Sequence, residues 1–474
     1  MMNNLEFIDS FVIMSSQKKL GYFSLALLNL SAIISVRHLP MMATYGGVSL
    51  LFYLVGAITF LIPIGLICAE LATTWPERGG LYNWIYQAMG KRLAFLVVWW
   101  SWLAAITTIM SNLTFLSVTM GYAIAPGYLD NPKFITIISI SVIWLMTFIN
   151  IFGMRLSAFI SSVGLMTGTI IPVTLVAFFA GYWAFTGNEI SQHALNFNPW
   201  AIVTGLSSLV FYSNVVLSFS GIELAAFHAA DAENPQRDYS KAIFLSVGMI
   251  ISIYLIATLS LAVVLPQKDT NLIGGLVQFF QTFFAKFGLI EMGAFLSLIL
   301  IVGSISGINT WLISPAKGIF AAAEHFHMPK WFSKVNEHGV PVNVLILQAL
   351  ICSFLVGVLS FSDSIESYFV LFANLTTQYS IMYYILMIIA VRLLRKKQPL
   401  IYRPFKISNK IFPLVTIGTL IALIAVLILT FIPPEGVIIN DIYKYEFFFF
   451  CGIVLFSLPV FFFKEIKLAP KRNH

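Results

Sequence analysis

Charged residues are scarce in this 474-residue chain, where Asp, Glu, Lys and Arg together make up 10%. A soluble domain carries about a quarter. Hydrophobic residues make up 59%, so an ordinary soluble protein is excluded. The apolar residues run together over about 20 positions, without the alternation of polar and apolar residues that a membrane β-barrel needs. We therefore expect a polytopic, all-α integral membrane protein.

Cysteine and catalytic clusters are also scarce. Cys68, Cys352 and Cys451 lie inside apolar runs without metal-ligand spacing, which argues against a disulfide framework and a thiolate metal site. The apolar runs contain no His-Glu-x-x-His motif, no paired aspartates and no filter repeat. A membrane-embedded enzyme and a channel are therefore remote alternatives, and we expect no metal, cofactor or catalytic residue.

Twelve apolar runs are bounded by charge, Pro or Gly, and each has about the length of a membrane helix. They cover residues 20–42, 47–72, 93–122, 134–154, 157–185, 203–229, 242–265, 290–316, 341–361, 365–391, 411–432 and 446–463. We expect residues 20–463 to form a single transmembrane domain, between a cytoplasmic N-terminus (1–19) and a short cytoplasmic tail (464–474).

Basic residues lie mostly on one side of these runs. A cytoplasmic N-terminus places 22 of the 27 Lys and Arg in inner segments and four in outer ones, with Arg37 inside the first run. Short loops rich in Lys and Arg are retained on the cytoplasmic side. The net charge of +7 therefore indicates topology in the inner (cytoplasmic) membrane, with lipid and not nucleic acid as the partner. Monomer and homodimer both stay open.

An internal repeat is visible in two segments that start with Gly-Gly-Leu and end with Gly, from Gly79 to Gly90 and from Gly274 to Gly288. Their offset of 195 residues, or five runs, carries the first run onto the sixth. Because five is odd, the second copy enters the membrane from the opposite face, which defines an inverted repeat. Repeat one covers about 20–185, repeat two about 203–391, and two extra helices about 411–463.

The first helix of each such copy is often broken at mid-membrane, where its free backbone groups face a substrate. The sixth run contains Ser218-Phe219-Ser220-Gly221-Ile222-Glu223, whose small residues let the backbone leave helical geometry. The matching stretch of the first run is Ser31-Ala32-Ile33-Ile34-Ser35. It lacks glycine, so the sequence predicts a break there less clearly.

Three segments resemble the amino acid–polyamine–organocation transporters, and among them the bacterial glutamate/GABA antiporter branch. They are A-E-L-A-T-T-W-P-E-R-G-G-L-Y-N-W (69–84), G-I-E-L-A-A-F-H-A-A-D-A-E-N-P-Q-R-D-Y (221–239), and S-P-A-K-G at 314 followed by M-P-K-W-F-S-K-V-N-E-H-G-V-P (328–341). The resemblance implies a LeuT-like five-plus-five inverted repeat with two extra C-terminal helices. It also implies a secondary active amino acid transporter that works by alternating access.

Glu223 stands at the Gly-[Ile/Val]-Glu position of the resembled family. A carboxylate on a half-buried helix is costly unless it is paired or protonated, so its protonation can be coupled to movement. The alternative is a carboxylate that merely reaches cytoplasmic water.

Arg37 has two possible roles. Its guanidinium could bind a carboxylate, of the substrate or of an acidic gate residue, or its side chain could extend to the outer headgroups. His38 and His228 are candidate pH sensors, or else hydrogen-bonded structural histidines. The glutamate/GABA exchanger lacks the Arg37-His38 pair, so its specificity does not transfer to these positions. The candidate substrate-binding residues are Ser31, Ile34, Ser35, Arg37, Phe219, Ser220, Gly221, Trp311 and Tyr379, with packing as the alternative for the aromatic ones.

The sequence does not determine which ion, if any, is coupled to transport. The fifth run has no lysine in Ser161-Ser162-Val163-Gly164, where the resemblance would place one in the role of a bound sodium ion. That leaves proton-linked exchange or a cation site near Ser304 and Ser306. We expect an amino acid antiporter with proton-sensitive gating. A proton- or sodium-coupled symporter is the alternative. Arg37, and Gly307 where the exchanger has an acid, favour a neutral or acidic substrate over a basic one.

Overall fold

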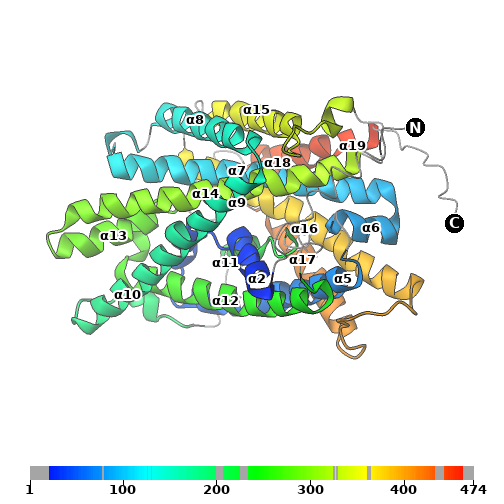
Figure 1. Ribbon diagram of the computed structural model, residues 1–474. Helices are drawn as coiled ribbons and strands as arrows, with labels where there is room; N and C mark the ends of the chain where they lie inside the picture. Colours follow the sequence, from blue (N-terminus) through cyan, green and yellow to red (C-terminus); the bar gives the residue numbers. More distant parts are fainter. Residues whose placement is uncertain are drawn as a thin grey trace.

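The structure, a computed structural model, describes residues 21–76, 80–124, 126–129, 131–198, 206–224, 233–323, 326, 329–359, 364–432 and 442–462. The regular elements over these residues are helices, packed side by side into one bundle (Figure 1). Each of the twelve predicted runs contains a helix. The predicted all-helical membrane protein is therefore confirmed.

Seven continuous helical segments are long and apolar enough to cross a membrane, and a bent pair makes an eighth. The seven segments are Val48–Thr74, Lys91–Ile124, Pro132–Ile151, Phe159–Phe185, Gln236–Val264, Glu291–Phe320 and Ile365–Lys397, and the bent pair is Tyr22–Ile33 with Val36–Ala43. Shorter apolar helices cover Val342–Val358, Leu414–Leu429 and Phe449–Phe462. A count of twelve crossings stays a prediction.

The helices that form the bundle are α2 (Tyr22–Ile33), η2 (Val36–His38), α3 (Leu39–Ala43), α4 (Val48–Gly56), η3 (Ala57–Leu61), α5 (Ile62–Thr74), α6 (Leu81–Met89), α7 (Lys91–Ile124), α8 (Pro132–Ile151), α9 (Met154–Leu165), η5 (Met166–Ile170), α10 (Ile171–Phe185), α11 (Leu206–Phe219), α12 (Pro235–Val264), α13 (Gly275–Lys286), α14 (Ile290–Ala323), α15 (Val342–Leu359), α16 (Ile365–Lys397), η11 (Leu414–Gly418), α17 (Thr419–Leu429), α18 (Ile442–Ser457) and α19 (Pro459–Phe462). Short 3-10 turns connect several of them, at Pro126–Tyr128, Gln192–Leu195, Gln267–Asp269 and Lys330–Ser333.

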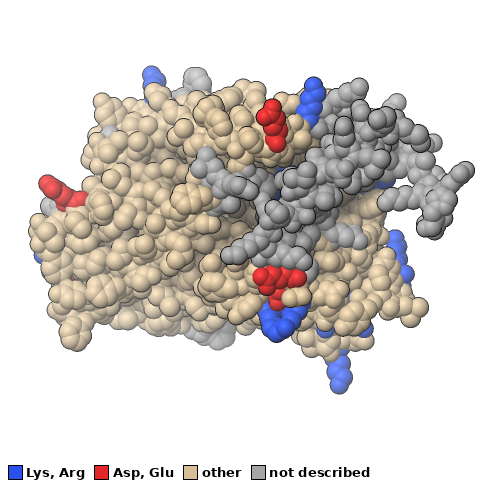
Figure 2. Space-filling view, in the orientation of Figure 1, with Lys and Arg blue, Asp and Glu red and all other residues tan. Residues whose placement is uncertain are grey.

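The centre of the bundle is formed by α7, α14 and α16. Both α14 and α16 pack along α7. In the most apolar stretch of α7, 89% of the residues are buried. A helix that is apolar on all sides belongs in the interior. Figure 1 shows α2 in the middle of the bundle, where it contacts α12, α14 and α9. The surface seen in Figure 2 carries few charged side chains, as a lipid-facing surface requires.

Two spans contain a π-helical turn that ends two residues before a proline. The turn η3 precedes Pro63, and η5 precedes Pro172. Proline has no N–H to donate, and its ring clashes with the carbonyl of the preceding turn. The wider π-helical turn accommodates both effects without ending the helix.

Small residues bring α9 and η5 against α14. A Cβ added to Gly168 would lie 2.0 Å from the backbone nitrogen of Gly303, and one added to Gly164 would lie 2.2 Å from Cβ of Ser306. Glycines four residues apart are the usual means by which membrane helices approach closely. Polar bonds join the same surfaces, because Asn309 Nδ2 donates to the Ser157 backbone oxygen at 2.8 Å and to Ser161 Oγ at 2.8 Å.

Both segments of the predicted repeat contain a short helix in the structure. Gly80 has φ +44° and precedes α6, and Gly90 follows α6 with φ +90°. Gly274 precedes α13, and Gly288 follows it with φ +70°. Only glycine adopts such positive angles without strain. The inverted repeat itself stays a prediction.

Candidate functional site

The first span is broken between α2 and η2. Ile34 and Ser35 have extended backbone there, with ψ of 117° and 118°. Tyr254 on α12 spans the break: its Oη accepts from the Ser35 N–H at 3.1 Å and donates to the Ile33 carbonyl at 3.0 Å. The hydroxyl therefore replaces helical hydrogen bonds that the break removes, as buried backbone in a membrane requires.

The sixth run is also interrupted, because α11 ends at Phe219 and Gly221 has φ +118°. The Gly221 N–H donates to Tyr384 Oη at 2.9 Å. A Cβ added to Gly221 would lie 3.3 Å from the Ala32 carbonyl oxygen. The two breaks therefore lie against each other, and each is hydrogen-bonded by a buried tyrosine from another helix.

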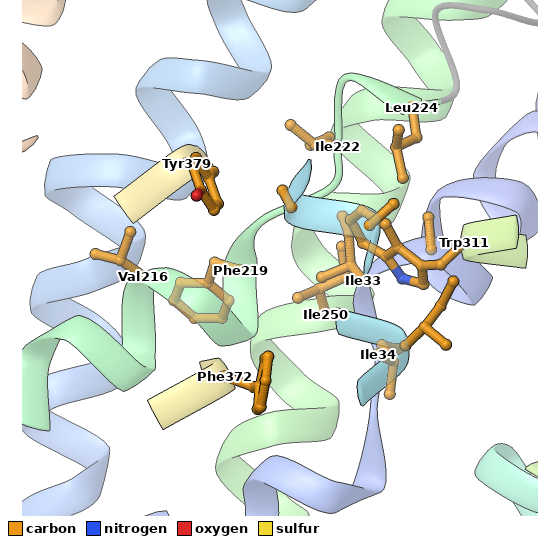
Figure 3. Packing of buried hydrophobic residues seen from close by; sticks show 14 of the residues in the cluster. Ile33, Ile34, Val216, Phe219, Ile222, Leu224, Ile250, Trp311, Phe372 and Tyr379 are labelled. Carbon is orange, nitrogen blue, oxygen red and sulfur yellow. The ribbon is translucent and has the colours of Figure 1, made fainter. Parts of the chain in front are cut away.

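Two small cavities adjoin the break of the first span. Four residues line both cavities: Ala32, Ser35, Arg37 and Trp311. The first cavity is also lined by Ser31, Ile34, Val36, Asn112, Phe115, Leu165, Thr169, Gly303, Ser304, Ser306 and Gly307. The second is also lined by Ile33, His38, Thr108, Leu217, Ser220 and Thr376. Figure 3 shows Trp311 beside Ile33 and Ile34 at one side of this region.

Arg37 lines both cavities and is buried, with 4% of its surface exposed. Its Nη1 donates to Ser35 Oγ at 3.3 Å, and its Nε has no hydrogen-bond partner. Among the described residues that line the two cavities, none is an Asp or Glu. A guanidinium that extends to the headgroups would be exposed at the surface, whereas this one faces the interior.

The helix α7 contributes residues that sequence reasoning missed. Asn112 and Thr108 are 3% and 1% exposed, and Asn112 Nδ2 and Thr108 Oγ1 have no hydrogen-bond partner. With Phe115 they line the cavities at spacings of four and three residues, which places them on one helix face. The available signal was an asparagine in a long apolar run, since polar side chains inside a membrane are costly and mark functional surfaces.

Glu223 is fully buried and lines neither cavity. Tyr383 donates to its Oε1 at 2.7 Å, and Tyr384 donates to its Oε2. Among the described residues, no Lys, Arg or His forms an ion pair with it. Because Tyr384 also accepts from Gly221, the carboxyl group is connected to the break of the sixth run through α16.

The other predicted site residues divide between the cavities and the surrounding packing. Ser31, Ile34, Ser35, His38, Ser220 and Trp311 line at least one cavity. Phe219, Gly221 and Tyr379 do not. Phe219 packs against the rings of Tyr53 and Tyr254, and Tyr379 donates to the Gly452 carbonyl at 3.3 Å. His228 lies outside the described residues.

Ser304 and Ser306, the candidate cation site, donate their hydroxyls to the carbonyls of Leu300 and Ser161, at 3.1 and 2.8 Å. Within the described part of the chain, no group of three His, Cys, Asp or Glu side chains is placed to hold a metal ion.

Comparison with known proteins identifies the family. The model of the amino acid permease family matches residues 20–458. A transporter of Legionella pneumophila that is named as uncharacterized is 34% identical over 93% of this chain and 95% of its own. A glutamate/gamma-aminobutyrate antiporter of Lactococcus lactis is 28% identical over 97% and 92%. A probable agmatine/putrescine antiporter of the same species is 26% identical over 89% and 90%. The chain therefore belongs to the amino acid permease family, which confirms the predicted membrane amino acid transporter and excludes an enzyme.

Proposed function

We propose that this protein is an amino acid antiporter of the cytoplasmic membrane. The observation that carries the proposal is the pair of adjoining helix breaks beside buried cavities, in a family of amino acid permeases. The relatives that are named as antiporters support exchange over one-way transport. The substrate is a single free amino acid.

The broken helix α2 supplies backbone groups for such a substrate. Its last turn includes Ser31 and Ala32, which line the cavities. The carbonyl end of a helix carries partial negative charge, which suits the ammonium group of an amino acid. The N–H groups of Val36 and Arg37 open the next helical turn, where no preceding turn supplies a carbonyl, and they suit the α-carboxylate.

The transport cycle that we propose is alternating access in a LeuT-like fold. Ten spans form the inverted repeat, two spans follow it, and both termini lie in the cytoplasm. The family implies this fold, and the short helices α6 and α13 and the two breaks occur at corresponding positions of the proposed repeats. Movement of one repeat against the other would expose the cavities to each side in turn.

Glu223 is the group that we propose for proton sensitivity, with His38 as a second candidate beside the second cavity. The Glu223 carboxyl group accepts hydrogen bonds from two hydroxyls and has no cationic partner among the described residues. A change in its protonation would alter its bonds to Tyr383 and Tyr384, and through Tyr384 the bond to the broken backbone at Gly221.

Exchange in proteoliposomes tests the function. Purified protein is reconstituted, loaded inside with an unlabelled amino acid, and given a panel of labelled amino acids outside. We expect uptake that requires internal substrate, because the binding site of a strict antiporter changes sides only when a substrate occupies it. Empty vesicles and protein-free vesicles are the controls. Equal uptake with and without internal substrate, dependent on sodium, would instead identify a symporter.

A further inference from the structure

We infer that the substrate carries a negative charge on its side chain, and that Arg37 and Asn112 hold this group. The inference rests on the proposed function, because it names the substrate class of the same site. It concerns two side chains that line the first cavity from different helices, η2 and α7.

Within the described part of the chain, no acidic side chain forms an ion pair with Arg37. Its Nη1 donates to the uncharged hydroxyl of Ser35, and its buried Nε has no hydrogen-bond partner among the described residues. Burying a cation without a partner is strongly unfavourable, so proteins pair buried charges or bind a counter-ion to them. Because the described residues that line the two cavities include no Asp or Glu, we assign the counter-ion to the ligand.

Asn112 provides a second donor to the first cavity, from α7. Its Nδ2 is buried and unpartnered, and a carboxylate has two oxygens that accept from several donors at once. Gly307 has no side chain, which leaves space beside Asn112. A Cβ added at Gly307 would lie 3.6 Å from Asn112 Oδ1, in van der Waals contact with it. A larger residue at Gly307 would fill the space in which we place the side-chain carboxylate.

The net charge of the occupied site distinguishes substrate classes. A neutral amino acid is a zwitterion, so the site would keep the uncompensated charge of Arg37 after binding. A cationic ligand would add to that charge. An amino acid with a side-chain carboxylate has net charge −1 and neutralises Arg37, while its main-chain groups stay with the backbone of the break. Electrostatics therefore favours an aspartate- or glutamate-like substrate.

The test compares pairs of substrates that differ only in charge. Exchange of glutamate is measured against glutamine, and of aspartate against asparagine, in proteoliposomes of the wild type and of Arg37→Gln. We expect the wild type to prefer the acids. Arg37→Gln should lower kcat/KM for the acids at least about 30-fold, because a buried charge pair loses one partner. It should lower kcat/KM for the amides less than about threefold.

Three further variants keep the result interpretable. Arg37→Lys keeps the charge but loses the planar guanidinium. We therefore expect its kcat/KM for the acids to lie between the values of the wild type and of Arg37→Gln. Arg392→Gln is the matched control, because it removes an arginine that donates to Thr416 Oγ1 at 2.6 Å and lines neither cavity. Asn112→Asp places a carboxylate in the cavity that Arg37 lines. It should lower the transport of the acidic substrates and leave that of the amides unchanged.

Other outcomes overturn either the inference alone or the proposed function. Equal losses for acids and amides in Arg37→Gln would mean that Arg37 holds the α-carboxylate, and would overturn the inference while leaving amino acid exchange intact. A wild type that prefers neutral or basic amino acids would do the same. Absence of amino acid exchange in the folded wild type would overturn the proposed function itself. Folding of each variant is checked by size-exclusion chromatography and thermal unfolding in detergent.

Discussion

At the scale of single residues, the few ionisable side chains inside the bundle differ in their partners. Glu223 accepts hydrogen bonds from two tyrosines, whereas Arg37 donates to Ser35 and its Nε has no partner among the described residues. Hydrogen bonds to hydroxyls stabilise a buried carboxyl group in either protonation state, because a tyrosine both donates and accepts. Such a group suits proton sensing, and an unpartnered cation suits ligand binding.

Replacing Glu223 by Gln tests the proton-sensing role. We expect transport that loses most of its dependence on pH while the protein stays folded, because the amide has nearly the same shape, accepts from one tyrosine and cannot titrate. Exchange rates are measured from pH 5 to pH 8. Glu291→Gln removes an exposed carboxylate at the start of α14 and is the control. An unchanged pH profile in Glu223→Gln would remove Glu223 from the mechanism.

At the scale of elements, the breaks in the first and sixth runs depend on partners from other helices. The first break lacks glycine, and its backbone is bonded by the Tyr254 hydroxyl. The second contains Gly221 with φ +118° and is bonded by the Tyr384 hydroxyl. Unbonded backbone groups in a buried, apolar environment cost several kcal/mol, so these hydroxyls are part of the broken conformation.

Replacing Tyr254 by Phe removes both hydrogen bonds at the first break. We expect the free energy of unfolding to fall by about 2 kcal/mol, since a donor and an acceptor are left buried, and exchange to slow. Tyr53→Phe is a matched control, because the Tyr53 ring stacks on Tyr254 and its hydroxyl accepts from Thr258 without bonding the break. Stability and rate are compared in detergent and in proteoliposomes. Equal effects of the two variants would contradict the role of Tyr254.

At the scale of the whole molecule, Glu70 connects segments that lie far apart in the sequence. From the end of α5 it accepts from Arg395 Nε at 2.7 Å and from the Ile407 N–H at 2.9 Å. Arg403 lies 3.5 Å away through its Nε. All three groups converge on one buried carboxylate, which fixes the segment after α16 against the second span.

Replacing Glu70 by Gln leaves two arginines without their carboxylate. Removing one partner of a buried ion pair costs about 3 to 5 kcal/mol, so we expect the Tm in detergent to fall by several degrees and the segment from 398 to 413 to become accessible to protease. Glu291→Gln, on an exposed acid, should leave both properties unchanged. A wild-type Tm and protease pattern in Glu70→Gln would show that the cluster does not hold the segment.

The length of the apolar runs and the distribution of charge predict the fold class of this protein without its tertiary structure. The scarcity of charge and the length of the apolar runs predict helices in a membrane, because backbone groups in lipid must bond within their own segment. Motifs such as Gly221-Ile222-Glu223 predict the family. Ser31, Ser35, Arg37 and Trp311, chosen from the sequence, all line the cavities.

The tertiary structure decided which residues from other helices complete the site. Asn112 and Thr108 face the cavities only because α7 lies at the centre of the bundle, and Tyr254 reaches the first break only because α12 packs on α2. Tyr379, also chosen from the sequence, bonds Gly452 instead. An apolar helix has no polar face to show its orientation, so the direction of each side chain depends on packing between helices, which the sequence of one helix does not contain.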